Sequence, residues 1–143
     1  MRRWALPLLM VLALTACGKS ISKTKYIEKA NGICTTMNAQ GNNLPDPGQD
    51  PTKLLSVVQQ AIPITDNALT QLRALPLPKG DEATLRSFYS KMDAVVSGLR
   101  QEAAALEASD LQKAQTVADS LDTATKAAND AANSYGLTVC GQA

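Results

Sequence analysis

Apolar residues recur at helical spacing along most of this 143-residue chain. From Ile27 to Tyr135 they stand three or four positions apart, and no stretch alternates between apolar and polar residues as a half-buried strand does. This spacing predicts amphipathic helices that each bury one face. A chain of this length usually forms one domain with a modest core. We therefore expect a single all-α domain.

The first predicted helix carries Ile27, Ala30, Cys34 and Met37 on one face and ends near residues 41–43. Cys34 should thus face the core. The glycine and asparagines at the end of this segment are typical helix stop signals. A proline-rich loop over residues 42–51 is expected to follow.

The second predicted helix begins with Asp50 as its N-cap and Pro51 at its first helical position. Pro63 lies inside this helix, lacks a backbone N–H and disfavours helical dihedrals in the residue before it. We therefore expect a kink or a break at Pro63. The apolar face of the segment comprises Leu54, Leu55, Val58, Ile62, Leu69 and Leu72.

Two further helices complete the pattern. Asp81 and Glu82 place negative charge at the start of the third, Ser109 or Asp110 caps the fourth, and Gly136 ends it. The apolar face of the third comprises Leu85, Phe88, Met92, Val95, Leu99, Ala103 and Leu106. That of the fourth is mostly alanine and comprises Leu111, Ala114, Ala118, Leu121, Thr125, Ala128, Ala132 and Tyr135.

Four helices with short connections favour an antiparallel four-helix bundle in up-down-up-down order. The spacing on the last two helices would also suit a coiled-coil-like hairpin packed against a partner. We favour the bundle within one chain, which places the end of the fourth helix beside the start of the first.

The N-terminus predicts export. Arg2 and Arg3 give a positive start, residues 4–14 are apolar, and Thr15 and Ala16 are small residues at a cleavage zone. The apolar run is shorter than the roughly 20 residues that a membrane-spanning helix needs. We therefore expect residues 1–16 to be a signal peptide.

The junction Leu14-Thr15-Ala16-Cys17 resembles the bacterial lipobox, in which the cysteine thiol is acylated and the signal peptide is cut before it. This resemblance implies lipidation of Cys17, with acyl chains such as palmitate, at the extracytoplasmic face of a bacterial cell membrane. Residues 17–25 would be the lipidated tether and residues 26–143 the helical bundle domain. An ordinary secreted protein is the alternative.

Two cysteines remain once Cys17 is assigned to the lipid, namely Cys34 and Cys140. Disulfides form and persist outside the cytoplasm. A redox or thiol site is the alternative, but the chain has no Cys-x-x-Cys pair and no histidine to activate a thiolate. We favour a structural disulfide that closes a loop around nearly the whole domain.

Three segments resemble small actinobacterial lipoproteins or secreted proteins of unknown function. They are YIEKANGIC at residues 26–34, LRALPLPKGDE at residues 72–82 and ANSYGLTVCG at residues 132–141. The resemblance implies a helical domain whose two flanking cysteines pair, which are Cys34 and Cys140 here. It implies no activity.

The amino-acid composition excludes several common classes of catalytic and metal-binding site. The absence of histidine excludes Ser-His-Asp and Cys-His catalysis and imidazole ligands, and the formal net charge of +1 gives no electrostatic reason to expect nucleic-acid binding. Two carboxylate pairs, Asp119 with Asp122 and Glu102 with Glu107, are expected on solvated faces.

Met37 and Met92 are the remaining candidates for a ligand role, because thioethers bind soft copper. Methionine at core spacing is more typical of packing, which is our interpretation. We expect no enzyme activity, no cofactor and no metal.

Two functions from different classes follow. The first is a non-catalytic binding or accessory module that presents a helix face or the loop at residues 42–51 to an envelope protein. The alternative is a carrier or sensor of a small apolar ligand held between the helices near Pro63, with Tyr89 or Tyr135 as a polar handle. An exposed apolar patch would favour the module, and a cavity would favour the carrier.

Overall fold

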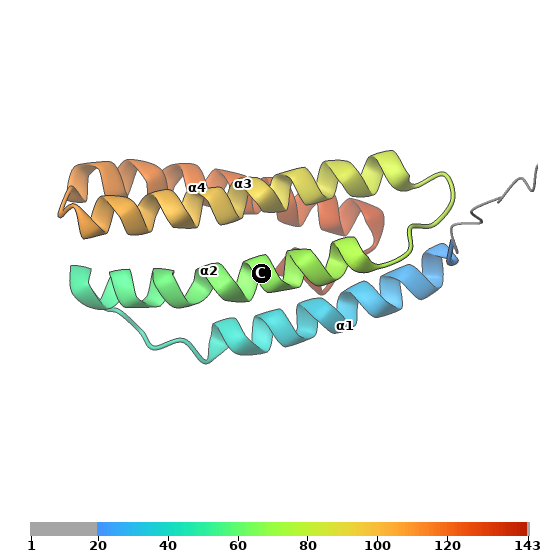
Figure 1. The fold of residues 1–143 in the computed structure, drawn as a ribbon, viewed down its shortest axis with the longest axis horizontal. Coiled ribbons are helices and arrows are strands. Elements are labelled where there is room, and N and C mark those ends of the chain that lie inside the picture. The colour runs from blue at the N-terminus through green and yellow to red at the C-terminus, as the bar shows by residue number, and fades with distance from the viewer. Residues whose placement is uncertain (1–19, 143) are drawn as a thin grey trace, which may run out of the picture.

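A computed structural model describes residues 20–142 of the chain. Within this range the chain forms four α-helices and one short 3-10 helix, with no strand (Figure 1). The helices are α1 (Lys23–Asn42), α2 (Pro51–Ala74), α3 (Glu82–Glu107), α4 (Leu111–Tyr135) and the 3-10 helix η1 (Cys140–Gln142). The predicted all-α class is confirmed.

The helices pack in chain order, α1 on α2, α2 on α3 and α3 on α4, and each runs antiparallel to the one before it (Figure 1). The predicted up-down-up-down bundle is therefore confirmed. The third and fourth helices pack closely on each other, as the alternative of a coiled-coil-like hairpin also required, but here they pack within the four-helix bundle of a single chain.

Several predicted helix boundaries are confirmed. The Asp50 side chain caps α2 by accepting from the backbone N–H of Thr52 at 2.9 Å. The Asp110 side chain caps α4 by accepting from the N–H of Lys113 at 3.0 Å. Gly136 ends α4 with a φ of 103°, a left-handed conformation that glycine adopts without a steric penalty.

Helix α1 begins at Lys23, three residues before the predicted domain boundary. Ser22 is its N-cap, and the Ser22 hydroxyl accepts from the Lys25 N–H at 3.3 Å. This bond satisfies one of the free N–H groups at the helix start. Residues 23–25 are thus helical, and the expectation that they belong to a flexible tether is wrong.

Pro63 lies inside α2, which continues from Pro51 to Ala74 as one helix (Figure 1). The expected alternative of a broken helix is therefore excluded. Buried side chains on both sides of the proline, Val58 before it and Leu69 after it, pack both halves of the helix against the rest of the bundle. Packing outweighs the local preference of proline here.

A disulfide joins Cys34 of α1 to Cys140 of η1, with a Cα–Cα distance of 5.0 Å. The predicted disulfide is confirmed. Both cysteines lie in the larger of two apolar clusters, Cys34 fully buried and Cys140 with 4% of its surface exposed. The smaller cluster lies between the first half of α2, the end of α3 and the start of α4.

The chain that follows α4 closes the side of the bundle between α1 and α4. The backbones of these two helices do not approach each other closely, although Tyr26 of α1 and Tyr135 of α4 meet edge to face with ring centroids 6.0 Å apart, whereas η1 packs on both helices. The Asn38 amide nitrogen donates to the Val139 carbonyl at 3.1 Å, and the Val139 N–H donates to the Asn31 side-chain oxygen at 3.2 Å. The disulfide and these bonds fix the C-terminal segment in place.

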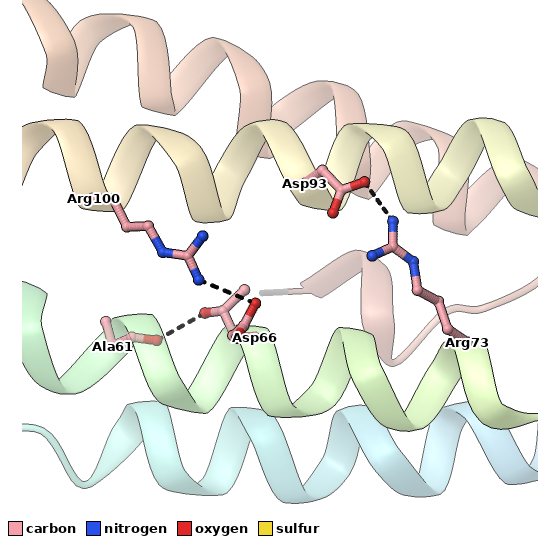
Figure 2. Close-up of polar contacts among 6 residues, drawn as sticks. Ala61, Asp66, Arg73, Asp93 and Arg100 are labelled. Atoms are coloured by element: carbon pink, nitrogen blue, oxygen red, sulfur yellow. Dashed lines mark hydrogen bonds and ion pairs between the residues drawn. The ribbon is translucent and has the colours of Figure 1, made fainter.

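Two ion pairs link α2 to α3 on the surface, Arg73 with Asp93 and Arg100 with Asp66, the latter at 3.4 Å (Figure 2). All four side chains are about half exposed. Such pairs contribute little to the free energy of folding because water screens them. The bundle is therefore held mainly by its apolar clusters and its disulfide.

The residues of the predicted apolar faces are buried or half-buried, with one exception at the tip of the bundle. Leu111, expected on the buried face of the fourth helix, has 54% of its surface exposed. It is the first residue of α4 and lies at the tip of the bundle, where the neighbouring helices end. The expectation that Leu111 is buried is therefore wrong.

Candidate functional site

A cleft of about 500 Å³ opens between the helices. All four helices line it, together with the start of the loop after α1 and the C-terminal segment. Ala61, Ile64 and Thr65 of α2 bring it next to Pro63, the position near which a ligand was expected. We call it the central cleft.

The central cleft lies where the backbones of α1 and α4 do not approach each other closely. Its lining includes the small residues Gly41, Ala61 and Ala128, which leave space between the helix backbones. Gly41 and Gln142 are exposed, so the mouth of the cleft lies between the end of α1 and the C-terminal segment. The disulfide therefore holds one rim of the cleft in place.

The lining is mainly apolar and carries amide and hydroxyl groups, with no Asp, Glu, Lys or Arg. Its apolar members are Met37, Leu44, Ala61, Ile64, Met92, Val95 and Ala128. Its polar side chains are Asn38, Asn42, Thr65, Thr125, Asn129 and Gln142. Such a surface suits an uncharged ligand with a few hydrogen-bonding groups.

Two of the polar groups are held by the protein itself. The Thr65 hydroxyl donates to the Ala61 carbonyl at 3.0 Å and keeps an acceptor oxygen. The Asn38 amide nitrogen donates one N–H to the Val139 carbonyl, which leaves its side-chain oxygen as an acceptor and its second N–H as a donor for a ligand. Both side chains are thus oriented before any ligand binds.

Met37 and Met92 both belong to the larger apolar cluster and line the central cleft, and each has 7% of its surface exposed. Their packing role agrees with the sequence interpretation. Within residues 20–142, no three His, Cys, Asp or Glu side chains come together as metal ligands would. The two thioethers give the cleft a flexible, polarisable wall.

The tyrosines expected to serve as polar handles do not line the cleft. Tyr89 donates to the Leu72 carbonyl at 3.0 Å and lies 2.5 Å from the Tyr26 hydroxyl, while Tyr135 donates to Asp81 at 2.7 Å. Burial raises the pKa of all three phenols above the usual value. The expected handle is therefore wrong, because these hydroxyls bond at one end of the bundle.

Of the carboxylates, Asp119, Asp122 and Glu107 are exposed as predicted. Glu102 is buried, with 7% of its surface exposed, so its predicted place on a solvated face is wrong. The reason is that α3 packs against both α2 and α4, which cover two of its flanks. Leu99 and Leu106 stand three residues before and four after Glu102, a spacing that signalled the burial.

The sequence also missed most of the polar lining of the central cleft. Asn38 and Thr65 carried no signal, because polar residues beside an apolar stripe are ordinary surface positions. Thr125 is the exception, since it interrupts the predicted apolar face of the fourth helix at a position that the structure places in the cleft. A polar residue within an apolar face was the usable signal.

The predicted signal peptide and Cys17 lie outside the described residues. Within the described part, none of the helices has both the length and the apolar character that crossing a bilayer requires. The described part of the chain thus belongs to the class of disulfide-linked four-helix bundles, with a cleft between the helices that no charged side chain lines. No protein-family model, curated protein or solved structure matches it.

Proposed function

We propose that this protein is a lipid-anchored lipoprotein on the extracytoplasmic face of a bacterial cell membrane, and that its bundle carries a small, uncharged, mainly apolar ligand. The observation that supports the carrier is the central cleft. Its volume of about 500 Å³ lies within the roughly 300–1,000 Å³ typical of small-molecule sites. Its mouth at Gly41 and Gln142 would let a ligand enter and leave without unfolding the bundle.

The absence of charged side chains from this lining supports the chemical class of the ligand. An ionised ligand would lose its water on entry without gaining an opposite charge, which is costly. A neutral molecule with one or two donors could instead bond to the oxygens of Asn38 and Thr65 while its apolar body contacts Met37 and Met92. The protein is a non-catalytic binder in this proposal.

The accessory module, ranked first from the sequence, has less support. Among the described residues Leu111 is the one large apolar side chain that is classed as exposed. A protein-docking face usually exposes a broader apolar patch. We therefore rank the carrier first and keep the envelope protein partner as the second candidate.

The anchor is proposed from the sequence alone and has its own test. Cells fed an alkyne-labelled palmitate should incorporate the label into the wild-type chain and not into Cys17→Ser. The wild-type chain should sediment with membranes, and Cys17→Ser should appear in the soluble extracytoplasmic fraction. Label on both chains, or on neither, would refute the anchor.

The carrier is tested with N-phenyl-1-naphthylamine, a neutral apolar probe whose fluorescence rises when it leaves water. The Cys17→Ser chain serves as the host because it needs no detergent. We expect saturable binding that Ala61→Trp weakens, because the indole would fill the central cleft. Ala39→Trp is the matched control, since Ala39 is exposed on α1 and outside the cleft.

Folding of both variants is checked by circular dichroism and thermal unfolding. No saturable binding, or equal binding by Ala61→Trp and Ala39→Trp, would contradict the carrier.

A further inference from the structure

A second cleft lies at the tip of the bundle, with a volume of about 190 Å³. The start of α2, the end of α3 and the start of α4 line it, and α1 contributes no residue. In Figure 1 this is the end where α2, α3 and α4 extend beyond α1. No residue lines both this cleft and the central cleft. We call it the distal cleft.

Glu102 lines the distal cleft and has 7% of its surface exposed. Within the described part of the chain, no side chain or backbone group forms a hydrogen bond or ion pair with it; the ion pairs there use Asp66, Asp93 and Asp130. Among the described residues, every side-chain oxygen or nitrogen that is fully shielded from solvent has a hydrogen-bond partner. Because Glu102 has no such partner, its carboxyl oxygens must keep some solvent-accessible surface. The carboxyl group therefore faces the cleft without a protein partner.

The charges around Glu102 are negative. Asp122 of α4 acts on it from one side, and Asp50 lines the cleft at the start of α2. One oxygen of Asp50 accepts from the backbone N–H groups of Thr52 and Lys53, so this oxygen is engaged in capping α2. No lysine or arginine lines the cleft. A buried carboxylate without a partner is costly, and a cation entering the cleft would remove that cost.

The walls of the distal cleft are apolar. Leu54 and Leu106 line the cleft together with Glu102, and so does Leu111, which is 54% exposed. An apolar wall around one carboxyl group fits a cation that carries an alkyl stem. The volume is small, about 190 Å³, which suits a single such group and not a larger molecule.

We propose that the distal cleft binds a primary alkylammonium group, with the ammonium at Glu102 and the alkyl stem against Leu54, Leu106 and Leu111. An ammonium has three donors. The Glu102 carboxylate offers two acceptor oxygens, and Gln115 offers a third, since its amide nitrogen already donates to Asp119 at 2.9 Å. A divalent cation fits less well, because it needs several oxygen ligands and no cluster of three acidic side chains occurs among residues 20–142.

This site does not depend on the ligand of the central cleft. The group could belong to a free alkylamine or to a lysine side chain of another protein, and the two sources share the same chemistry. The test separates them.

The full chain, purified in detergent micelles with its disulfide intact, is titrated with n-butylamine while NMR follows the Leu111 methyl and Gln115 amide signals. We expect saturable shifts that Glu102→Gln weakens about tenfold or more, because a buried charge pair is lost. Glu107→Gln is the matched control, since Glu107 is an exposed carboxylate on the same helix. 1-Butanol, which has the same length and no charge, should bind far more weakly than n-butylamine.

A further arm titrates the peptide acetyl-Gly-Lys-Gly-amide and the same peptide with its lysine acetylated. Tighter binding of the unmodified peptide than of n-butylamine would assign the site to a protein lysine. Exclusion of both peptides with retained binding of n-butylamine would assign it to a free amine. Equal binding of n-butylamine and 1-butanol, or equal binding by wild type and Glu102→Gln, would overturn the proposal.

Discussion

Glu102 shows how the surroundings of one residue affect the stability of the whole fold. Burial, followed by the nearby charge of Asp122, raises the pKa of its carboxyl group above the usual value. The folded chain therefore holds this proton at a pH at which the unfolded chain has released it. The resulting stabilisation is fully present below the unfolded-state pKa and is lost as the pH rises through the folded-state pKa.

Glu102→Gln should abolish this dependence. As the pH rises from about 4 towards neutral, the free energy of unfolding of the wild type is expected to fall relative to that of Glu102→Gln. Urea unfolding at a series of pH values measures the difference. Asp50 and Asp122, the other acidic groups near the site, are present in both proteins. Parallel pH profiles for wild type and Glu102→Gln would contradict this expectation.

Gly136 is a residue whose backbone conformation a side chain would disturb. Its φ is 103°, and an added Cβ would lie 3.3 Å from the Ile27 side chain. Gly136→Ala should lower the free energy of unfolding by about 1 kcal/mol or more. Gly32→Ala is the control, because Gly32 lies within α1 with open space around it and should gain about 0.5–1 kcal/mol from the higher helix propensity of alanine. Chemical denaturation measures the free energy of unfolding of both variants. If both substitutions raised it, or both lowered it, the proposed roles of the two glycines would be wrong.

At the scale of elements, the disulfide connects the C-terminal segment to α1 across a sequence separation of 106 residues. Replacing both cysteines by serine should cost about 4–5 kcal/mol in the chain-entropy model, because the unfolded chain loses its constraint. Urea unfolding of Cys34→Ser/Cys140→Ser against the wild type measures the loss. Because both sulfurs are buried, alkylation after mild reduction should be slow until the fold opens. Equal unfolding midpoints would contradict the role of the disulfide.

Helix α2 contains two prolines, Pro51 at its first position and Pro63 in its interior. Pro63→Ala restores a backbone N–H inside α2, and we expect a gain of about 1–3 kcal/mol in the free energy of unfolding. Pro51→Ala is the matched control and should change stability by less than about 0.5 kcal/mol, because the first helical position has no intrahelical acceptor for that N–H. A loss of stability in Pro63→Ala would show that the proline is required for packing.

The sequence predicted those elements whose signals are local. Asp50 with Pro51, Asp110 and Gly136 each act through their own side chain or backbone, so their boundaries followed from residue type. At Pro63 the break is excluded, because α2 continues to Ala74 and buried side chains on both sides of the proline oppose the local tendency to break the helix. Ser22 was a usable cap signal that the sequence interpretation overlooked.

At the scale of the whole molecule, the sites were the least predictable part. The central cleft depends on the distance between α1 and α4, which no residue pattern encodes. A ligand site near Pro63 was the alternative expectation, but its tyrosine handle was wrong, because the Tyr89 hydroxyl bonds to Tyr26 and the Leu72 carbonyl and the Tyr135 hydroxyl bonds to Asp81. The distal cleft depends on where three helices end together.

The disulfide lies next to the central cleft, and the distal cleft lies at the far end of the bundle. The disulfide fixes the C-terminal segment between α1 and α4, and this segment forms one rim of the central cleft through Gln142. The distal cleft lies at the other end of the bundle from the start of α1, where the proposed tether would join (Figure 1). A lipid anchor at Cys17 would thus place the distal cleft away from the membrane.

The central claim is that the bundle carries a small uncharged molecule in the central cleft. Native mass spectrometry of the full chain, gently extracted from its own membranes, tests this claim most directly. We expect a discrete mass beyond that of the acylated chain in the wild type and in Ala39→Trp, and its loss in Ala61→Trp. A wild-type chain without a bound small molecule, or with a mass that Ala61→Trp retains, would contradict the account.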